Sequence, residues 1–270
     1  IVYSVAAFCA KFSFFSDPYR ICIVIPTALS IMLVTVLFGN ISAVLLSLIL
    51  SLGVLNAANW ELAPFLFTLA TALCSSAIVR KIERRLDLVV AGLLIALFEV
   101  VFVLLILVIY NETFTELLPL VLGIIVNGFI SGILTLGLLT PLEIIMNTAS
   151  VFRLMDLSDN NVPIFKQMQI QANGTYNHSM MVAQLAESAC REIGANSILA
   201  RVGGYYHDIG KIEMSEYFVE NQQNMENKHS DLNPTLSASV IKSHVKKGVE
   251  KGHQLHLPQA VSDIIAEHHG

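Results

Sequence analysis

The sequence predicts an all-α protein, in which a polytopic helical membrane region is followed by a second region that is also entirely helical. Of the 270 residues, 54% are hydrophobic and 14% are charged, whereas soluble domains carry roughly a quarter charged residues. The mean hydropathy is +0.66, and the long apolar runs end near residue 147. Beyond residue 175, apolar residues recur at helical spacing, and no segment alternates as a strand would.

Five apolar segments ahead of residue 147 are long enough to cross a bilayer, which takes ~20 helical residues. They cover residues 21–38, 41–58, 62–79, 86–110 and 117–139. Residues 1–15 are apolar but shorter, and we expect them to be the end of a span whose beginning is missing. Pro26 falls inside the first complete span, where neighbouring helices can satisfy the backbone group that it frees.

The distribution of basic residues predicts the orientation of these spans. One short loop holds Arg80, Lys81, Arg84 and Arg85, and loops of this kind face the cytoplasm. The next loop, 111–116, carries two glutamates and no basic residue, so we expect it on the outer side. The final span then leads inward, and the region that follows it should lie in the cytoplasm.

Residues 148–174 are predicted to connect the two regions. Apolar positions indicate a short amphipathic helix at residues 152–157, and a polar turn precedes Pro163. Such a connector could transmit a signal or act only as a tether. We thus divide the chain into a transmembrane region (1–147), a juxtamembrane linker (148–174) and a helical domain (175–270) that we expect to be incomplete at its C-terminal end.

Four histidines of the second region stand where a helix would place an apolar core residue, and each lies on a different predicted helix. They are His178, His207, His244 and His268. Around His178, apolar residues follow at helical offsets and predict one buried face, formed by Met181, Val182 and Leu185. Three further histidines lie in polar stretches and are interpreted as surface residues: His229, His253 and His256.

The neighbours of the four histidines favour a metal site. Asp208 directly follows His207, and His269 directly follows His268. A single histidine on an apolar face is usually a core residue, but four of them beside a carboxylate and a second imidazole are hard to explain as packing. Imidazole nitrogen and carboxylate oxygen together suit Fe, Mn or Zn.

Lys211 lies three residues after Asp208, near the predicted end of a helix that runs from residue 197 to about residue 209. It could contact a substrate phosphate or assist the leaving group, which makes Asp208 and Lys211 the candidate catalytic residues. Equally, Lys211 could interact with the C-terminal carbonyls of its helix. The polar segment 216–231 is either a flexible loop near the site or a solvated insertion.

Charge and cysteine content exclude other classes of protein. The formal net charge of -5 argues against a general nucleic-acid binder, so we expect no nucleic acid polymer as a partner. The chain has four cysteines, and none of them forms a CxxC pair. A disulfide framework and a structural zinc site are therefore not indicated.

The order of the histidine and aspartate positions resembles the HD superfamily of metal-dependent phosphohydrolases, in its HDIG-containing branch. Several short sequence segments, together with the apolar spans, resemble the seven-transmembrane HD proteins. These segments are residues 174–179, 193–196, 199–203, 205–211 and 220–222. The resemblance implies an all-helical HD fold that binds two divalent transition-metal ions, commonly Fe or Mn. It assigns the metal ligands to His178, His207, Asp208, His244, His268 and His269. Asp208 would bridge the two ions.

The same resemblance implies a cyclic-dinucleotide phosphodiesterase in the bacterial inner membrane, with the HD domain in the cytoplasm. The substrate would be cyclic di-AMP, cleaved to pApA under the control of an extracytoplasmic sensor. The lipid bilayer is the other expected partner, and a homo-oligomer is left open. A later aspartate ligand and the sensor would lie outside this chain.

Two alternatives stay open. Cyclic di-GMP hydrolases of the superfamily generally continue from the doubled histidine into glutamate and a Gly-Tyr-Pro motif, whereas Gly270 follows His269 here, which disfavours that substrate. The other alternative is a membrane receptor that binds a nucleotide without cleaving it. Such a receptor could have lost metal ligands, but every ligand position within this sequence is filled.

Overall fold

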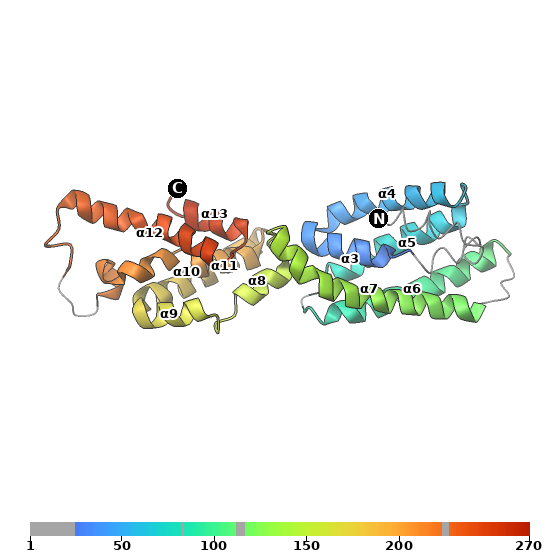
Figure 1. Ribbon diagram of the computed structural model, residues 1–270, viewed down its shortest axis with the longest axis horizontal. Helices are drawn as coiled ribbons and strands as arrows, with labels where there is room; N and C mark the ends of the chain where they lie inside the picture. The colour runs from blue at the N-terminus through green and yellow to red at the C-terminus, as the bar shows by residue number, and fades with distance from the viewer. Residues whose placement is uncertain (1–24, 83, 112–116, 223–226) are drawn as a thin grey trace. The chain divides into compact units, whose positions relative to one another are not determined.

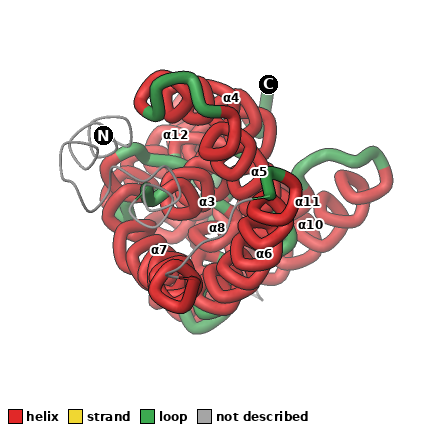
Figure 2. The backbone as a smooth tube through the Cα atoms, turned by 90° about the vertical axis from the view of Figure 1, so that its right-hand side faces the viewer, coloured by secondary structure: helices red, strands yellow, loops and turns green. Residues whose placement is uncertain are grey.

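The computed structural model describes residues 25–82, 84–111, 117–222 and 227–270, and the regular structure in these ranges is entirely helical. Figure 1 labels the helices, and Figure 2 shows helices joined by loops, with no strand among the described residues. The predicted all-α fold is confirmed. The chain divides into two compact units, Ile1–Ile144 and Ile145–Gly270, which we call unit 1 and unit 2.

Unit 1 contains a series of apolar helices. They are α3 (Thr27–Phe38), α4 (Asn40–Ala57), α5 (Leu62–Val79), α6 (Asp87–Ile109) and α7 (Leu117–Ile145). The last four are long and apolar enough to cross a membrane, in agreement with four of the predicted spans. The partial span expected at residues 1–15 lies outside the described ranges.

The first complete span differs from the prediction at Pro26. α3 has 12 residues and begins directly after Pro26, whose φ is -80° and ψ is 56°. Proline lacks an N–H and its ring clashes with the preceding helical turn, so the helix starts after the proline rather than continuing through it. Residues 21–24 of the predicted span lie outside the described ranges.

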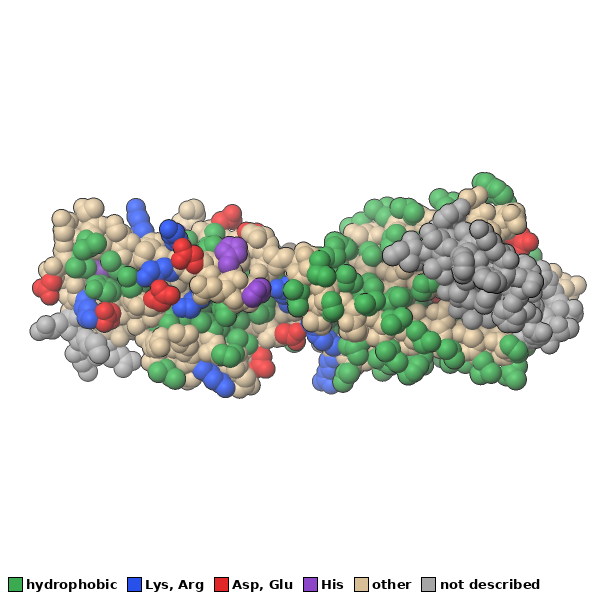
Figure 3. Space-filling view, viewed as in Figure 1, with side chains coloured by type: hydrophobic (Ala, Val, Ile, Leu, Met, Phe, Trp, Pro, Cys, Tyr) green, Lys and Arg blue, Asp and Glu red, His purple; other side chains and the backbone are tan. Residues whose placement is uncertain are grey.

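The surface of unit 1 carries many large apolar side chains, coloured green in Figure 3. Ile49, Leu97 and Val108 are 65%, 62% and 77% exposed. Small polar residues face the interior instead, and Ser47, for example, donates a hydrogen bond to the carbonyl of Ala43 at 2.7 Å. Lipid tails solvate apolar side chains but cannot satisfy polar groups, so this distribution is the one expected for helices in a bilayer.

Unit 2 consists of helices around one apolar core. Its α-helices are α8 (Val151–Leu157), α9 (Pro163–Gln171), α10 (Asn173–Glu192), α11 (Ser197–Tyr206), α12 (Pro234–Gln254) and α13 (Gln259–Glu267). Two 3-10 helices, η2 (Ile209–Tyr217) and η3 (Val219–Asn221), lie between α11 and α12. The polar segment 216–231 therefore begins with ordered structure, and its residues 223–226 lie outside the described ranges.

The segment expected to be a linker is packed into unit 2. Its helices α8 and α9 contribute Leu154, Phe165 and Met168 to the same buried core as Tyr206. The Tyr206 hydroxyl also donates a hydrogen bond to the carbonyl of Leu157 at 3.0 Å. Residues 148–174 thus contribute to the same core as the helices that carry the histidines.

α10 buries a different face from the predicted one. Met181 and Leu185 are 60% and 72% exposed, whereas Ser179 and Ala183 are fully buried. The close approach of α11 explains the difference, because a Cβ atom on Gly204 would lie only 2.6 Å from the Cα atom of Ala183. The distance between two packed helices depends on the side chains at their contact, and contact this close admits only the small residues of α10.

Candidate metal centre

The His207-Asp208 pair lies at a sharp transition between two helices. α11 ends at Tyr206 and η2 begins directly after Asp208, so the helix ends about three residues earlier than predicted. Gly210 lets the following turn approach α12, because a Cβ atom there would overlap the carbonyl oxygen of His244. The missing side chain at this position brings His244 next to the pair.

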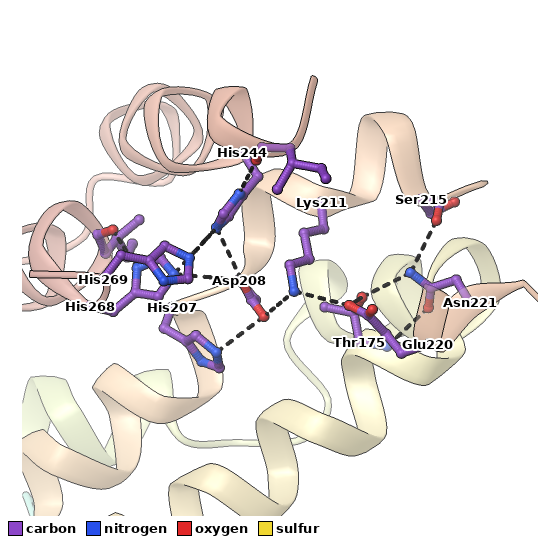
Figure 4. A network of polar contacts seen from close by, with 12 residues as sticks. Thr175, His207, Asp208, Lys211, Ser215, Glu220, Asn221, His244, His268 and His269 are labelled. Atoms are coloured by element: carbon purple, nitrogen blue, oxygen red, sulfur yellow. Dashed lines mark hydrogen bonds and ion pairs between the residues drawn. The ribbon is translucent and has the colours of Figure 1, made fainter. Parts of the chain in front are cut away.

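The structure brings the six candidate ligands together in two groups of three, and the ligand atoms of each group lie within 4.8 Å of one another. The first group is His178, His207 and Asp208, and the second is His244, His268 and His269. Asp208 belongs to the first group and also faces the second, and Figure 4 shows it between His207 and His244. Its Oδ1 atom lies 3.5 Å from Nε2 of His244 and 3.7 Å from Nε2 of His268.

Backbone carbonyl groups orient three of the imidazole rings. Nδ1 donates to the carbonyl of the residue three positions earlier, at 2.8 Å for His207 and 2.9 Å for His268, and His244 makes the equivalent bond. A carbonyl only accepts, so Nδ1 carries the proton and Nε2 of a neutral ring is left with a lone pair. Outer partners of this kind fix the orientation and tautomer of metal-binding histidines.

The Nε2 atoms of the second group converge on one another. His244 Nε2 lies 3.3 Å from His268 Nε2 and 3.1 Å from His269 Nε2. Two lone pairs at such distances repel each other unless a proton or a cation lies between them. The donor set of this group therefore fits a transition-metal ion.

Asp208 is 2% exposed. Its Oδ2 atom lies 2.8 Å from Lys211 Nζ and 3.1 Å from His207 Nε2, whereas Oδ1 has no hydrogen-bond partner. Leaving a buried polar atom unsatisfied costs about 1–3 kcal/mol, and more for a charged group, so a cation beside Oδ1 would be stabilising. Burial raises the pKa of Asp208, but hydrogen bonds from His207 and Lys211 outweigh burial and lower it.

His207 responds to Asp208 in the opposite sense. Burial lowers the pKa of the imidazole, but the hydrogen bond and the charge of Asp208 outweigh burial and raise it above its ordinary value. A metal ion binds the neutral imidazole, so metal binding at His207 would compete with protonation of the ring.

His178 lies at the edge of the cluster, on an exposed part of α10. Its ring centroid is 5.4 Å from that of His207. A cavity of about 520 Å³ opens beside both rings, within the size range of small-molecule sites. Its lining consists of His178, Val182, Ala186, Ala200, Gly203, Gly204, His207, Asp208, Lys211, Ile264, His268 and His269.

Lys211 joins two carboxylates and does not cap α11, which has already ended at Tyr206. Its Nζ atom lies 2.8 Å from Asp208 Oδ2 and 2.9 Å from Glu220 Oε1. Burial lowers the pKa of Lys211, but the bonds to Asp208 and Glu220 outweigh burial and raise it. A positive charge therefore stays at the edge of the candidate metal centre.

Glu220 is a residue of the site that sequence reasoning did not identify. It lies in η3, inside the segment expected to be a loop or an insertion, and it is tied to Thr175 as well as to Lys211. The segment 220–222 resembles the seven-transmembrane HD proteins and was the available signal for this residue, but the sequence does not indicate which residues Glu220 contacts.

The histidines interpreted as surface residues are only partly so. His253 and His256 are exposed. His229 is half-buried, and its two ring nitrogens lie 2.9 Å from Ser237 Oγ and 2.7 Å from the carbonyl oxygen of Tyr217. The surface interpretation was therefore wrong for His229, because this ring ties the polar segment to η2 and α12.

Comparisons with known proteins extend over both units. Residues 1–150 match the family model described as a 7TM receptor with intracellular HD hydrolase, and residues 175–270 match the model of the HD domain. The chain belongs to the 7TM receptor family with an intracellular HD hydrolase. This 7TM-HD chain is therefore a multi-pass membrane protein, in agreement with the apolar helices of unit 1.

Two relatives of the 7TM-HD chain are named cyclic-di-AMP phosphodiesterase PgpH. The Bacillus subtilis protein is 35% identical over 256 residues, which is 91% of this chain and 36% of the relative. The Listeria monocytogenes protein is 41% identical over 207 residues, which is 76% of this chain and 29% of the relative. The chain thus spans about a third of the length of these relatives.

A solved structure also resembles part of the chain. The HD domain of Listeria monocytogenes PgpH in complex with cyclic di-AMP is 50% identical, and the match covers 42% of this chain and 53% of that chain. The TM-score is 0.40.

Proposed function

We propose that this 7TM-HD protein is a metal-dependent phosphodiesterase that hydrolyses cyclic di-AMP to the linear dinucleotide pApA. The observation that carries the proposal is the position of Asp208, a buried carboxylate that lies between His207 of the first group and His244 of the second. Membership of the HD hydrolase family supports the reaction class. The names of the PgpH relatives support cyclic di-AMP over cyclic di-GMP as the substrate.

The six candidate ligands fit a pair of divalent transition-metal ions, which in this proposal are Fe or Mn. The first group of three would hold one ion and the second group the other, with Asp208 shared between them. When bound, the ions supply positive charge that offsets the phosphodiester and activate water as the nucleophile. The fixed negative charge of Asp208 would keep the two cations close together.

Lys211 is the residue that we assign to the substrate. Its ammonium group is anchored by Asp208 and Glu220 and forms part of the cavity wall. From there it can donate to a phosphate oxygen and offset the negative charge that develops on the leaving oxygen. Val182, Ala186 and Ile264 form an apolar part of the same wall, where a nucleobase could replace water.

The proposal places the HD domain in the cytoplasm, since Arg80, Lys81, Arg84 and Arg85 favour the cytoplasmic side for their loop. In this proposal the membrane region ends near residue 147 and the HD domain covers residues 175–270. The segment 148–174 between them contributes side chains to the core of unit 2. An extracytoplasmic sensor would control hydrolysis from outside this chain.

Turnover by purified full-length protein tests the proposal. Protein loaded with Mn or Fe should convert cyclic di-AMP to pApA, measured by anion-exchange chromatography, and should convert cyclic di-GMP more slowly. Binding of cyclic di-AMP without turnover would favour the receptor alternative. Faster cleavage of cyclic di-GMP would leave the reaction class in place and overturn the substrate.

A further inference from the structure

We propose that Glu220 is a positioning residue for Lys211, and that Thr175 and Asn221 form a clasp that holds Glu220 in place. The proposal rests on the phosphodiesterase function above, because it takes Lys211 to act on the substrate. Glu220 and Asn221 belong to the sequence segment 220–222. The proposed function assigns no role to this segment.

Lys211 needs a second anchor when cations occupy the centre. Its Nζ atom lies 2.8 Å from Asp208 Oδ2, an oxygen of the carboxylate that the ions would share. Cations repel the ammonium group and compete with it for that carboxylate. Figure 4 shows the Lys211 nitrogen between Asp208 and Glu220. Glu220 Oε1, at 2.9 Å from Nζ, offers an anchor outside the candidate ligand set.

The clasp ties Glu220 to α10. Glu220 Oε1 accepts a hydrogen bond from Thr175 Oγ1 at 3.2 Å. Asn221 bonds to Thr175 twice, since its Oδ1 accepts from the Thr175 backbone N–H at 2.9 Å and its Nδ2 donates to Thr175 Oγ1 at 2.9 Å. Nδ2 also donates to the carbonyl of Ser215 at 3.2 Å. Thr175 is fully buried, so the bonds that it makes are shielded from water at the Thr175 end.

Gly174 makes the clasp possible. A Cβ atom at this position would overlap the backbone carbonyl of Glu220, so a larger residue would push η3 away from α10. Phe218, just before η3, places its ring centroid 5.0 Å from Lys211 Nζ. The segment 218–221 is thus held beside the Lys211 ammonium group in three ways: by the backbone contact at Gly174, by the hydrogen bonds of the clasp and by the Phe218 ring.

A double-mutant cycle in the full-length, metal-loaded protein tests the proposal. We expect Glu220→Ala to lower kcat for cyclic di-AMP by about tenfold or more, since one charge-stabilising donor contributes on the order of 10² to kcat. KM should change by less than about threefold, and bound metal should stay at the wild-type level. The double variant with Lys211→Ala should be no slower than Lys211→Ala alone, because Glu220 acts through Lys211.

Gly174→Ala and Glu213→Ala complete the design. Gly174→Ala should reproduce the loss in kcat while both charged groups are kept, with circular dichroism confirming that the variant is folded. Glu213 is the matched control: it lies on η2 and pairs with Lys247 at 3.5 Å and Lys251 at 3.4 Å, outside the clasp. Glu213→Ala should leave kcat unchanged.

The outcomes separate the two proposals. Wild-type kcat in Glu220→Ala, or losses that multiply in the double variant, would overturn the positioning role while the phosphodiesterase function stands. A lower melting temperature of Glu220→Ala with unchanged kcat would likewise overturn it and leave a purely structural salt bridge. A wild-type protein that binds cyclic di-AMP without turnover would overturn the phosphodiesterase function itself.

Discussion

His244 and His268 direct their Nε2 atoms at each other across 3.3 Å, although the Nδ1 atom of each ring already donates to a backbone carbonyl. Neutral rings in this state have only lone pairs to offer on the facing nitrogens. The buried Oδ1 atom of Asp208 faces the same space without a hydrogen-bond partner. The side chains are therefore arranged around a position that favours a cation.

Removal of metal should destabilise unit 2 as well as inactivate it. A ligand present at 100 times its Kd stabilises the folded state by about 2.7 kcal/mol. We expect EDTA-treated protein to melt at a lower temperature than Mn-loaded protein in differential scanning calorimetry. A wild-type melting temperature that does not respond to Mn would contradict the assignment of a metal centre.

Asp208→Ala should lose metal from both groups of ligands, because the carboxylate belongs to the first group and faces the second. Loss of an outer-shell partner alone costs about 10–100-fold in metal affinity or activity, so we expect turnover of cyclic di-AMP to fall by about 100-fold or more. Elemental analysis should show less metal per chain. His253→Ala replaces an exposed histidine outside the cluster and should retain both metal and turnover.

Gly210→Ala should separate η2 from α12, because the added Cβ would overlap the carbonyl oxygen of His244. Overpacking of this kind costs about 1–3 kcal/mol of stability. Gly252→Ala is the matched control, since its Cβ would make ordinary contacts, the nearest at 3.5 Å. Chemical denaturation should show a loss for Gly210→Ala and none for Gly252→Ala. Equal stability of the two variants would contradict the close approach.

The candidate ligands were predicted from the sequence because four histidines lie at helical offsets from apolar residues, which is a local pattern, and the structure brings these histidines into two neighbouring groups. His244 and His268 each follow apolar residues at helical offsets, and the chain order alone places them on separate helices. The buried face of α10 could not be found in the same way. Periodicity identifies apolar positions, but the distance between α10 and α11 is set by Gly204 against Ala183, which is a long-range contact.

The clasp and the packing of residues 148–174 could not be predicted from the sequence for a related reason. Asn221 and Thr175 are 46 residues apart in the chain, and neither residue type signals which distant partner it will bond. Leu154 and Met168 show local helical patterns, but only the fold reveals that they share a core with Tyr206. Local patterns therefore predicted the helices and pointed to a histidine cluster, whereas the residues that support the site depend on tertiary contacts.

Met168→Ala should test whether the predicted linker, residues 148–174, contributes to the stability of unit 2. Met168 is fully buried in the core, and truncation of such a side chain costs about 2–5 kcal/mol. Ile170 lies on the same helix but is 84% exposed, so Ile170→Ala should change stability by less than about 0.5 kcal/mol. Urea denaturation monitored by circular dichroism measures both. Similar midpoints for Met168→Ala and wild type would indicate a linker that is not part of the core.

Glu220 should give the metal-free protein a measurable dependence of stability on acid pH. Burial raises the pKa of Glu220, but the hydrogen bond from Lys211 contributes to a net lowering below its ordinary value. A glutamate has a pKa of about 4.3 in the unfolded chain. When folding lowers that pKa, the ionised carboxylate stabilises the folded state, and this contribution is fully present above the unfolded pKa. It is lost as the pH falls through the lower pKa of the folded state. The difference in melting temperature between wild-type and Glu220→Gln protein, both treated with EDTA, should therefore be largest near neutral pH and shrink below about pH 4.3. A difference that stayed constant across this range would show that the ion pair of Glu220 with Lys211 contributes nothing to stability.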